Sequence, residues 1–230
     1  MIPRVLNFLA LASIKLFART FYRVENTWLN NKPGEDPWKG MRLIVFLNHT
    51  SLFEPLLLGA APWRMLWQMA GRIIAPGADV TMNRPIAGKL LKYIAPKMIP
   101  ISRERDETWN QFMDAIEPES VVIIAPEGRM MRENGLDKHG NPMSVRGGVA
   151  DILELLETGE MVIVYSGGLH HVQKPGEGLP KLFKRIRLQC EKINISKYIA
   201  TMKQNSESSF TKAVKQDFED SMKRNVPKRN

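Results

Sequence analysis

Hydrophobic residues along this chain fall into short continuous runs and helix-spaced stripes, separated by segments rich in turn-forming residues. A strand covered on both faces presents apolar side chains without alternation, so short continuous runs predict buried strands. Such runs occupy residues 41–47, 64–69, 97–101, 121–125 and 161–165. Alternation over residues 184–190 predicts one further, late strand.

Helical periodicity occurs between and after these runs. It predicts helices over residues 85–94, 103–116 and 147–157. Apolar residues also recur at every fourth position from Phe210 to Met222, which predicts a C-terminal helix over about residues 206–224 packed on the core. Strands that alternate with helices are typical of an α/β fold. We therefore predict a single α/β domain with a largely parallel central sheet flanked by helices.

The first 24 residues differ from the rest of the chain. A nearly uninterrupted apolar run covers residues 5–17 and is shorter than the roughly 20 residues that a membrane-spanning helix needs. Basic residues flank or interrupt this run, at Arg4, Lys15, Arg19 and Arg23. Such a segment can lie in the membrane interface with its basic groups at the lipid head groups. We predict an interfacial helix over residues 1–24 ahead of a domain over residues 38–230; the alternative is a first helix packed on the core.

Composition narrows the choice of partners. The chain has 230 residues, of which 43% are hydrophobic, and this suits one domain with a sizeable core. Its single cysteine, Cys190, excludes a disulfide framework and metal sites built from cysteine pairs. The net charge of +9 suits an anionic membrane, an acidic carrier protein or nucleic acid.

A candidate catalytic pair follows the first of the predicted strands. His49 comes two residues after that strand, and Glu54 lies five residues further on. A carboxylate bound to one ring nitrogen orients the imidazole and stabilises its protonated form, so that the other nitrogen takes a proton from a substrate hydroxyl. Glu54 is alternatively a capping residue for a helix that begins near Ser51.

Three further segments follow predicted strands or open a predicted helix. Arg103 comes just after the strand over residues 97–101, and a guanidinium can bind phosphate or carboxylate through two hydrogen bonds. The segment Pro-Glu-Gly-Arg leaves the next strand and places three candidates on a loop: Glu127, Gly128 and Arg129. Arg146 precedes two glycines that open a helix, whose N-terminal N–H groups suit an anion.

The order and spacing of these segments resemble the lysophospholipid acyltransferase family, the PlsC-like 1-acylglycerol-3-phosphate acyltransferases. The family's first motif, Asn-His-x4-Asp, is matched by Asn48, His49 and Glu54. Its second motif ends in Ile-x-Arg, which is matched through Arg103. Its third motif, Phe-Pro-Glu-Gly-Thr-Arg, is matched by Pro-Glu-Gly at residues 126–128. The resemblance covers about residues 38–195.

This resemblance implies an enzyme that moves a fatty acyl group from acyl-CoA or acyl carrier protein to a hydroxyl of a lysolipid, with no metal and no further cofactor. It implies that His49 is the general base and that Glu54 orients it. The substrate-binding candidates are then Asn48, Ser51, Arg103, Glu127, Gly128, Arg129 and Arg146. The default acceptor is 1-acylglycerol-3-phosphate, and the expected location is the cytoplasmic face of the inner membrane, on a surface of anionic lipids.

Two departures from the family pattern bear on the acceptor. Glu54 replaces the usual Asp, and its extra methylene lengthens the reach while keeping the charge. The family's Thr-Arg reads Arg129-Met130, so the guanidinium comes one position early and Arg132 is the other candidate. The shift leaves open an acceptor without phosphate, such as a lyso-aminolipid, and also a non-catalytic lipid-binding relative.

Other functions fit the sequence less well. Nucleic-acid binding is disfavoured because the aromatic residues do not interleave with the basic ones. A serine hydrolase would need a Gly-x-Ser-x-Gly segment, which the chain lacks. His139, His170 and His171 have no carboxylate at ligand spacing, so they are interpreted as surface or loop residues rather than metal ligands.

Overall fold

A seven-stranded sheet forms the centre of the computed structural model, which describes residues 3–30, 35–78, 82, 87–102, 104–204 and 209–228. The strand order is β1-β7-β6-β2-β5-β3-β4. The bounds are β1 Arg23–Trp28, β2 Met41–Leu47, β3 Ile73–Ala78, β4 Lys97–Ile101, β5 Val121–Ile124, β6 Glu160–Ser166 and β7 Arg185–Asn194. Every neighbouring pair is parallel except β6 and β7. The prediction of a largely parallel sheet is confirmed.

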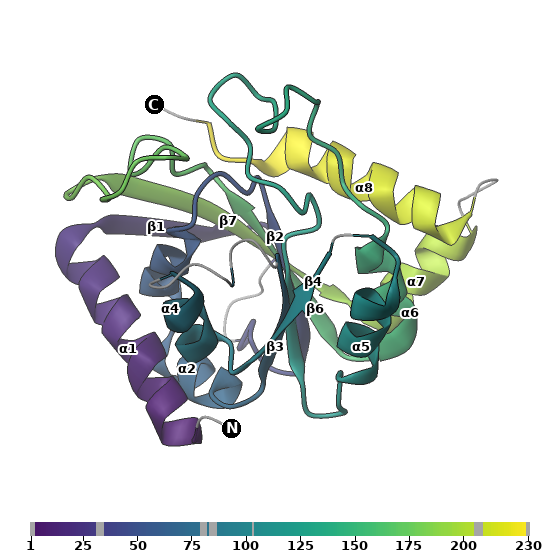
Figure 1. The fold of residues 1–230 in the computed structure, drawn as a ribbon. Helices are drawn as coiled ribbons and strands as arrows, with labels where there is room; N and C mark the ends of the chain where they lie inside the picture. The colour runs from purple at the N-terminus through teal and green to yellow at the C-terminus, as the bar shows by residue number, and fades with distance from the viewer. Residues whose placement is uncertain are drawn as a thin grey trace.

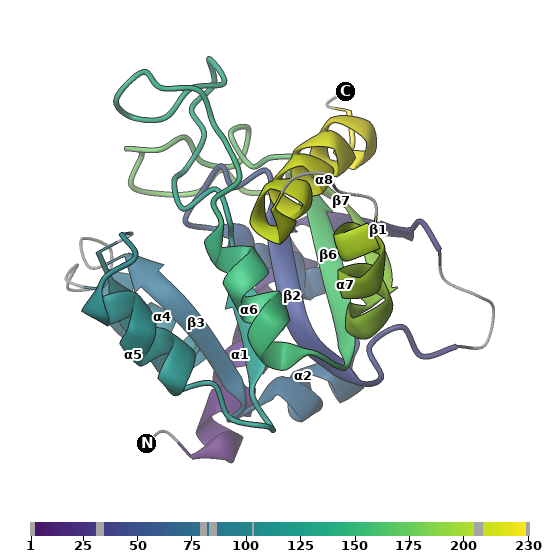
Figure 2. The ribbon, with the colours of Figure 1, turned by 90° about the vertical axis from the view of Figure 1, so that its right-hand side faces the viewer.

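Helices cover both faces of this sheet (Figures 1 and 2). One face carries α1 Arg4–Phe21, the 3-10 helix η1 Glu54–Ala60, α2 Trp63–Met69 and α4 Ala87–Ile94. The other face carries α5 Glu107–Asp114, α6 Gly148–Leu156, α7 Ile195–Gln204 and α8 Phe210–Asn225. Two apolar clusters, one on each side, fill the space between the sheet and its helices. The α/β class with flanking helices is therefore confirmed.

Most predicted elements occur within a few residues of their expected bounds, and caps explain the shifts. The helix expected from residue 103 begins at Glu107, because the Asp106 side chain accepts hydrogen bonds from the N–H groups of Thr108 and Trp109. The C-terminal helix begins at Phe210, because the Ser209 side chain caps it in the same way.

One predicted strand is wrong, and three elements were not predicted. Residues 64–69 belong to helix α2, which begins after Pro62 and buries Met65, Leu66 and Met69 on one side. The short apolar run did not distinguish a strand from a buried helical turn. Strands β1 and β3 and helix α7 lacked a clear signal: β1 is a polar edge strand, and β3 contains Pro76 and Gly77.

Helix α1 packs against η1 and the sheet instead of standing apart from the domain. Leu11 and Ala18 are fully buried on its inner face. Lys15 is buried there too, at 2% exposed, and its Nζ donates hydrogen bonds to the carbonyl oxygens of Gly59, at 3.3 Å, and of Ala61. The expectation that Lys15 lies at lipid head groups is therefore wrong, because the side chain points into the protein.

The opposite face of α1 is apolar and exposed. Five of its side chains project outward: Val5, Leu6, Leu9, Leu16 and Phe17. No helix in the described part of the chain is both long and apolar enough to cross a bilayer. Helix α1 thus combines the two interpretations of the sequence, a face packed on the core and an apolar face toward solvent.

Candidate functional site

The candidate base lies at the carboxyl end of the central strand β2. Asn48, the first residue after that strand, has a positive φ of 67°, a conformation that asparagine tolerates better than most residues. Its side-chain amide donates a 2.7 Å hydrogen bond to the carbonyl oxygen of Ser166 at the end of β6. This left-handed turn redirects the chain and places His49 at the mouth of a pocket.

Glu54 binds His49 with one carboxylate oxygen and the backbone with the other. Its Oε2 lies 2.5 Å from Nδ1 of His49, and its Oε1 accepts a 2.8 Å hydrogen bond from the N–H of Thr50. Glu54 is also the first residue of η1, with Pro55 following in the first turn. The pairing of Glu54 with the histidine is therefore confirmed. The alternative, that Glu54 caps a helix beginning near Ser51, is wrong, because η1 begins at Glu54 itself and has no side-chain cap.

Glu127 holds the backbone of this turn through hydrogen bonds. It is 3% exposed, and its Oε1 accepts hydrogen bonds from the backbone N–H groups of Asn48, at 2.6 Å, and of His49, at 3.3 Å. Its Oε2 is buried without a hydrogen-bond partner among the described residues. Burial raises the pKa of this carboxyl, and the backbone donors and the nearby His49 offset part of that effect. Glu127 thus fixes the backbone that carries the base.

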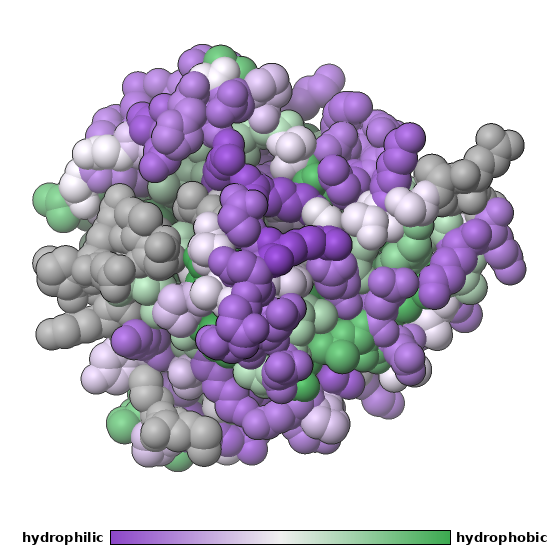
Figure 3. Space-filling model, turned by 45° about the vertical axis from the view of Figure 1, so that its right-hand side comes forward, coloured by the Kyte–Doolittle hydropathy of each residue, from purple (hydrophilic) through white to green (hydrophobic). Residues whose placement is uncertain are grey.

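An open pocket of about 670 Å³ contains His49 and Glu54 at one end. Four cationic side chains also line it: Arg105, Arg129, Arg146 and Lys215. Figure 3 shows the face that includes α5 and α8, where hydrophilic side chains gather across the middle. The pocket thus joins a histidine–carboxylate pair to a group of cations.

A second, smaller cavity of about 180 Å³ lies on the other side of Glu54 and is almost entirely apolar. It is enclosed by the sheet and by α1, η1, α2 and α4. Several residues line both cavities, among them Phe46, Glu54 and Ala75. The two spaces therefore meet beside the carboxylate that holds His49.

Comparison with known proteins agrees with this geometry. Residues 30–164 match the acyltransferase family. The chain belongs to that family. Its fold is similar to the crystal structure of the 1-acyl-sn-glycerophosphate (LPA) acyltransferase PlsC from Thermotoga maritima, with a TM-score of 0.54, 18% identity, and coverage of 94% of this chain and 78% of that one. No curated protein sequence matches the chain. The predictions of family and of an acyltransferase enzyme are confirmed.

Arg129 of this acyltransferase lines the pocket, but its guanidinium forms an ion pair with Asp137. It donates a hydrogen bond to Oδ2 of Asp137, whose side chain is 1% exposed. The other oxygen of Asp137 accepts from the N–H groups of His139 and Asn141, and these bonds hold the pKa of its carboxyl well below the usual range. Arg129 therefore anchors the loop above the pocket, the teal loop at the top of Figure 1.

Arg132, the other candidate for the displaced motif arginine, is exposed and does not line the pocket among the described residues. Arg103, expected to bind the acceptor, lies outside the described residues. Arg146 does line the pocket, and Gly128 lets it approach closely. A Cβ at Gly128 would lie 3.3 Å from Cδ of Arg146, and the φ of 65° at this glycine also disfavours other residues.

Three of the predicted substrate-binding residues have hydrogen-bond partners within the protein: Ser51, Asn48 and Glu127. Ser51 is buried, donates to Oε1 of Gln173 at 2.7 Å, and accepts from the N–H of Phe53 at 3.2 Å. Asn48 and Glu127 are not among the described side chains that line the pocket. These residues position the turn around His49.

Sequence reasoning missed several residues that brace this turn. The hydroxyl of Thr50 accepts from the N–H of Leu169 at 2.8 Å, and the N–H of Met131 donates to the carbonyl oxygen of His49 at 2.8 Å. His170, expected in a loop or on the surface, is a buried loop residue whose Nε2 lies 2.7 Å from the carbonyl oxygen of Met131. Only the fold brings residues so far apart in sequence together.

The other histidines also contact the backbone or solvent. Nε2 of His171 lies 2.6 Å from the carbonyl oxygen of Arg185. Within the described ranges, no group of three or more His, Cys, Asp or Glu side chains has the arrangement of a metal site. The single cysteine is buried, and burial raises the pKa of its thiol to about 12.

Proposed function

We propose that this acyltransferase moves a fatty acyl group from an acyl thioester to a free hydroxyl of a lysophospholipid of the 1-acylglycerol-3-phosphate type. The observation that carries this proposal is the 2.5 Å contact between Nδ1 of His49 and Oε2 of Glu54, at the point where a cationic pocket meets an apolar cavity. The name of the similar PlsC structure supports the same acceptor class.

The chemistry needs one proton acceptor and no acyl-enzyme. Nε2 of His49 removes the proton of the acceptor hydroxyl as its oxygen attacks the thioester carbonyl. Glu54 keeps the ring oriented and stabilises the imidazolium that forms. When the tetrahedral intermediate collapses, the new ester remains and the carbon–sulfur bond breaks. The leaving thiolate then takes the proton from His49. The donor is the thioester of coenzyme A or of acyl carrier protein.

The apolar cavity suits the acyl chain of the donor. Its lining is contributed by both the sheet and helices, with Leu57, Met65 and Val164 among the apolar side chains. Burial of each methylene group contributes roughly 0.8 kcal/mol, so such a cavity can hold a fatty chain tightly. Because Glu54 lines this cavity as well, a chain bound there would place its carboxyl carbon near His49.

The cationic end of the larger pocket suits an acidic head group. Among the residues that the structure describes, four basic side chains line it against one acidic residue outside the His49–Glu54 pair, Glu104. This balance favours a phosphate-bearing acceptor over a lyso-aminolipid, even though Arg129 is engaged by Asp137. Arg146 is the motif residue that we expect to contact the phosphate.

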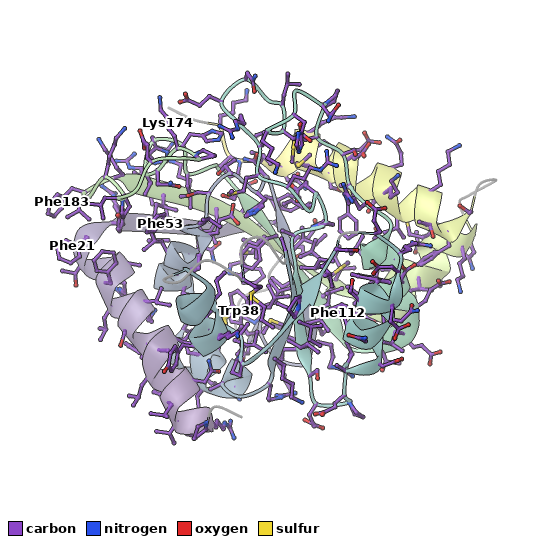
Figure 4. All side chains as sticks on the ribbon, viewed as in Figure 1. Phe21, Trp38, Phe53, Phe112, Lys174 and Phe183 are labelled. Carbon is purple, nitrogen blue, oxygen red and sulfur yellow. The ribbon has the colours of Figure 1, made fainter. Side chains whose placement is uncertain are left out.

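The exposed face of α1 suits a membrane surface. Its outward apolar residues adjoin two partly exposed tryptophans of α2, Trp63 and Trp67, and the guanidinium of Arg4 lies 4.5 Å from the centre of the Trp67 ring. Figure 4 shows Phe183 beside Phe21 at the other end of α1, with ring centres 5.9 Å apart. With the net charge of +9, this surface would bind anionic lipids on the cytoplasmic face of the inner membrane, where the soluble thioester donors are present.

A direct assay tests the whole proposal. The purified protein is supplied with acyl-CoA or acyl-loaded carrier protein and a mixed pool of lysolipids, and free thiol release and the lipids formed are measured, the latter by mass spectrometry. We expect thiol release coupled to formation of diacylglycerophosphate. A protein that binds lysolipids but releases no thiol with either donor would instead be a non-catalytic lipid-binding relative.

A further inference from the structure

Helix α8 lies beyond the region that matches the family, yet it forms part of the wall of the active-site pocket. The family match ends at residue 164, whereas α8 begins at Phe210. Its apolar side is fully buried at Val214 and Phe218, in the cluster that also holds α6 and α7. The helix is therefore a fixed part of the domain.

A second face of α8 contacts the segment that carries Arg146. Oε1 of Glu219 accepts a 3.1 Å hydrogen bond from the N–H of Val145. A Cβ added at Gly147 would lie 2.8 Å from Cγ2 of Thr211, so a glycine is needed for this close approach. Thr211 and Glu219 are two turns apart and share one face, and Lys215 lies midway between them on that face.

Lys215 thereby projects into the pocket beside the Arg146 segment. The structure gives two of the other cations carboxylate partners: Arg105 binds Asp151 at 2.7 Å, and Arg129 binds Asp137. Lys215 makes no ion pair with any residue that the structure describes. Lys215 as a whole is half-buried and lines a space that His49 also lines.

We propose that Lys215 binds a phosphate group of a substrate, next to Arg146. A phosphate monoester carries close to two negative charges near neutral pH, and a lysine ammonium binds it as a point charge while an arginine binds it in a forked manner. This inference rests on the proposed acyl transfer, and it identifies which part of the chain recognises the phosphate. Two substrates can supply the group: the acceptor head group, or the carrier moiety of the thioester.

Steady-state kinetics of Lys215→Ala test the assignment and distinguish the two sources. The substrates are acyl-CoA with either 1-acylglycerol-3-phosphate or monoacylglycerol, which lacks the phosphate. We expect the KM for the phosphate acceptor to rise about tenfold or more, as for loss of a charged hydrogen bond, while kcat and the rate with monoacylglycerol change little. A rise confined to the KM for acyl-CoA would place the phosphate on the donor instead.

Two variants complete the experiment. Lys215→Arg restores the charge and should recover most of the affinity. Lys212→Ala removes the same charge from an exposed position of α8 and should leave both KM values unchanged. Wild-type KM values for both substrates in Lys215→Ala, with an unchanged melting temperature, would overturn the inference. The proposed function is judged separately, by whether the wild-type protein transfers an acyl group at all.

Discussion

The two cavities that meet at Glu54 differ in size and in the charge of their linings. The smaller one is apolar and is formed by the sheet face that carries α1, η1, α2 and α4. The larger one is open and lined by four cations, with contributions from α5, α6, α8 and the loop between β5 and α6. The difference teaches how one site could accept an amphipathic substrate: an apolar space and a space that contains cations lie next to each other, and His49 and Glu54 lie beside both.

Replacement of His49 is the sharpest test of that arrangement. His49→Ala removes the proton acceptor and leaves both cavities in place, so we expect acyl transfer to fall by about 10²–10⁴-fold, the range of general base catalysis. The rate is measured by thiol release, and circular dichroism checks the fold. His171→Ala, an exposed histidine outside the pocket, is the matched control. Wild-type turnover in purified His49→Ala would rule out the base assignment.

Two changes at Glu54 separate the effect of its charge from that of its hydrogen bond to the N–H of Thr50. Glu54→Gln keeps an acceptor for the N–H of Thr50 but loses the charge that stabilises protonated His49, so we expect turnover to fall about a hundredfold. Glu54→Asp keeps the charge with a shorter reach and should lose much less. Equal activity of both variants and the wild type would show that the carboxylate only holds the backbone of Thr50.

Ala75, a buried strand residue, lines both cavities, so a larger side chain at this position would reduce the space where they adjoin. Ala75→Leu should lower kcat/KM for long-chain thioesters about tenfold relative to short-chain ones, because the larger side chain occupies the path of the chain. The short-chain donor is the internal control. An equal fall for both donors would argue that the apolar cavity does not hold the acyl group.

Changes on the exposed apolar face of α1 test whether this face binds the membrane. Deleting the helix would expose the core beneath Leu11 and Ala18, so point changes are better. We expect Leu9→Ser with Leu16→Ser to weaken binding to anionic vesicles several-fold, since each exposed leucine contributes apolar area to the bilayer. Leu155→Ser, an exposed leucine of α6, is the control in the same co-sedimentation assay. Unchanged binding of the double variant would reject this face as the contact.

The smallest expected effect is that of Glu127 on the stability of the fold. Its pKa is raised by burial above the value of about 4.3 for an unfolded chain. At pH values between the pKa of Glu127 in the unfolded chain and its raised pKa in the folded protein, the folded state binds more protons than the unfolded state. The free energy of unfolding of the wild type therefore falls as the pH rises through this range.

Glu127→Gln removes that titration while keeping an acceptor for the N–H of Asn48. Relative to the wild type, it should become more stable as the pH is raised from 4 toward neutrality, as measured by urea unfolding. Glu127→Ala loses the acceptor and should cost about 1–3 kcal/mol. A pH-independent difference between Glu127→Gln and the wild type would contradict the raised pKa.

Local sequence patterns predicted most of the sheet and the helices that flank it. Continuous apolar runs identified β2, β5 and β6 because a central strand is buried on both faces. The run at β4 was also identified correctly, although β4 is a partly exposed edge strand. The same rule failed at residues 64–69, where a short buried helix is equally apolar, and at β1, where an edge strand is polar. Short segments carry too little periodicity to separate these cases.

The sequence by itself predicted the contact between His49 and Glu54, because these residues are neighbours and their contact depends on one turn, and its motifs predicted the acyltransferase family. Only the tertiary structure decided which basic residues line the pocket. In the folded protein, Arg129 forms an ion pair with Asp137, and the side chain of Lys15 is buried between α1 and η1. Lys215, on helix α8, lines the pocket. Contacts between residues far apart in the chain depend on how helices pack across a sheet, and no local pattern records that packing.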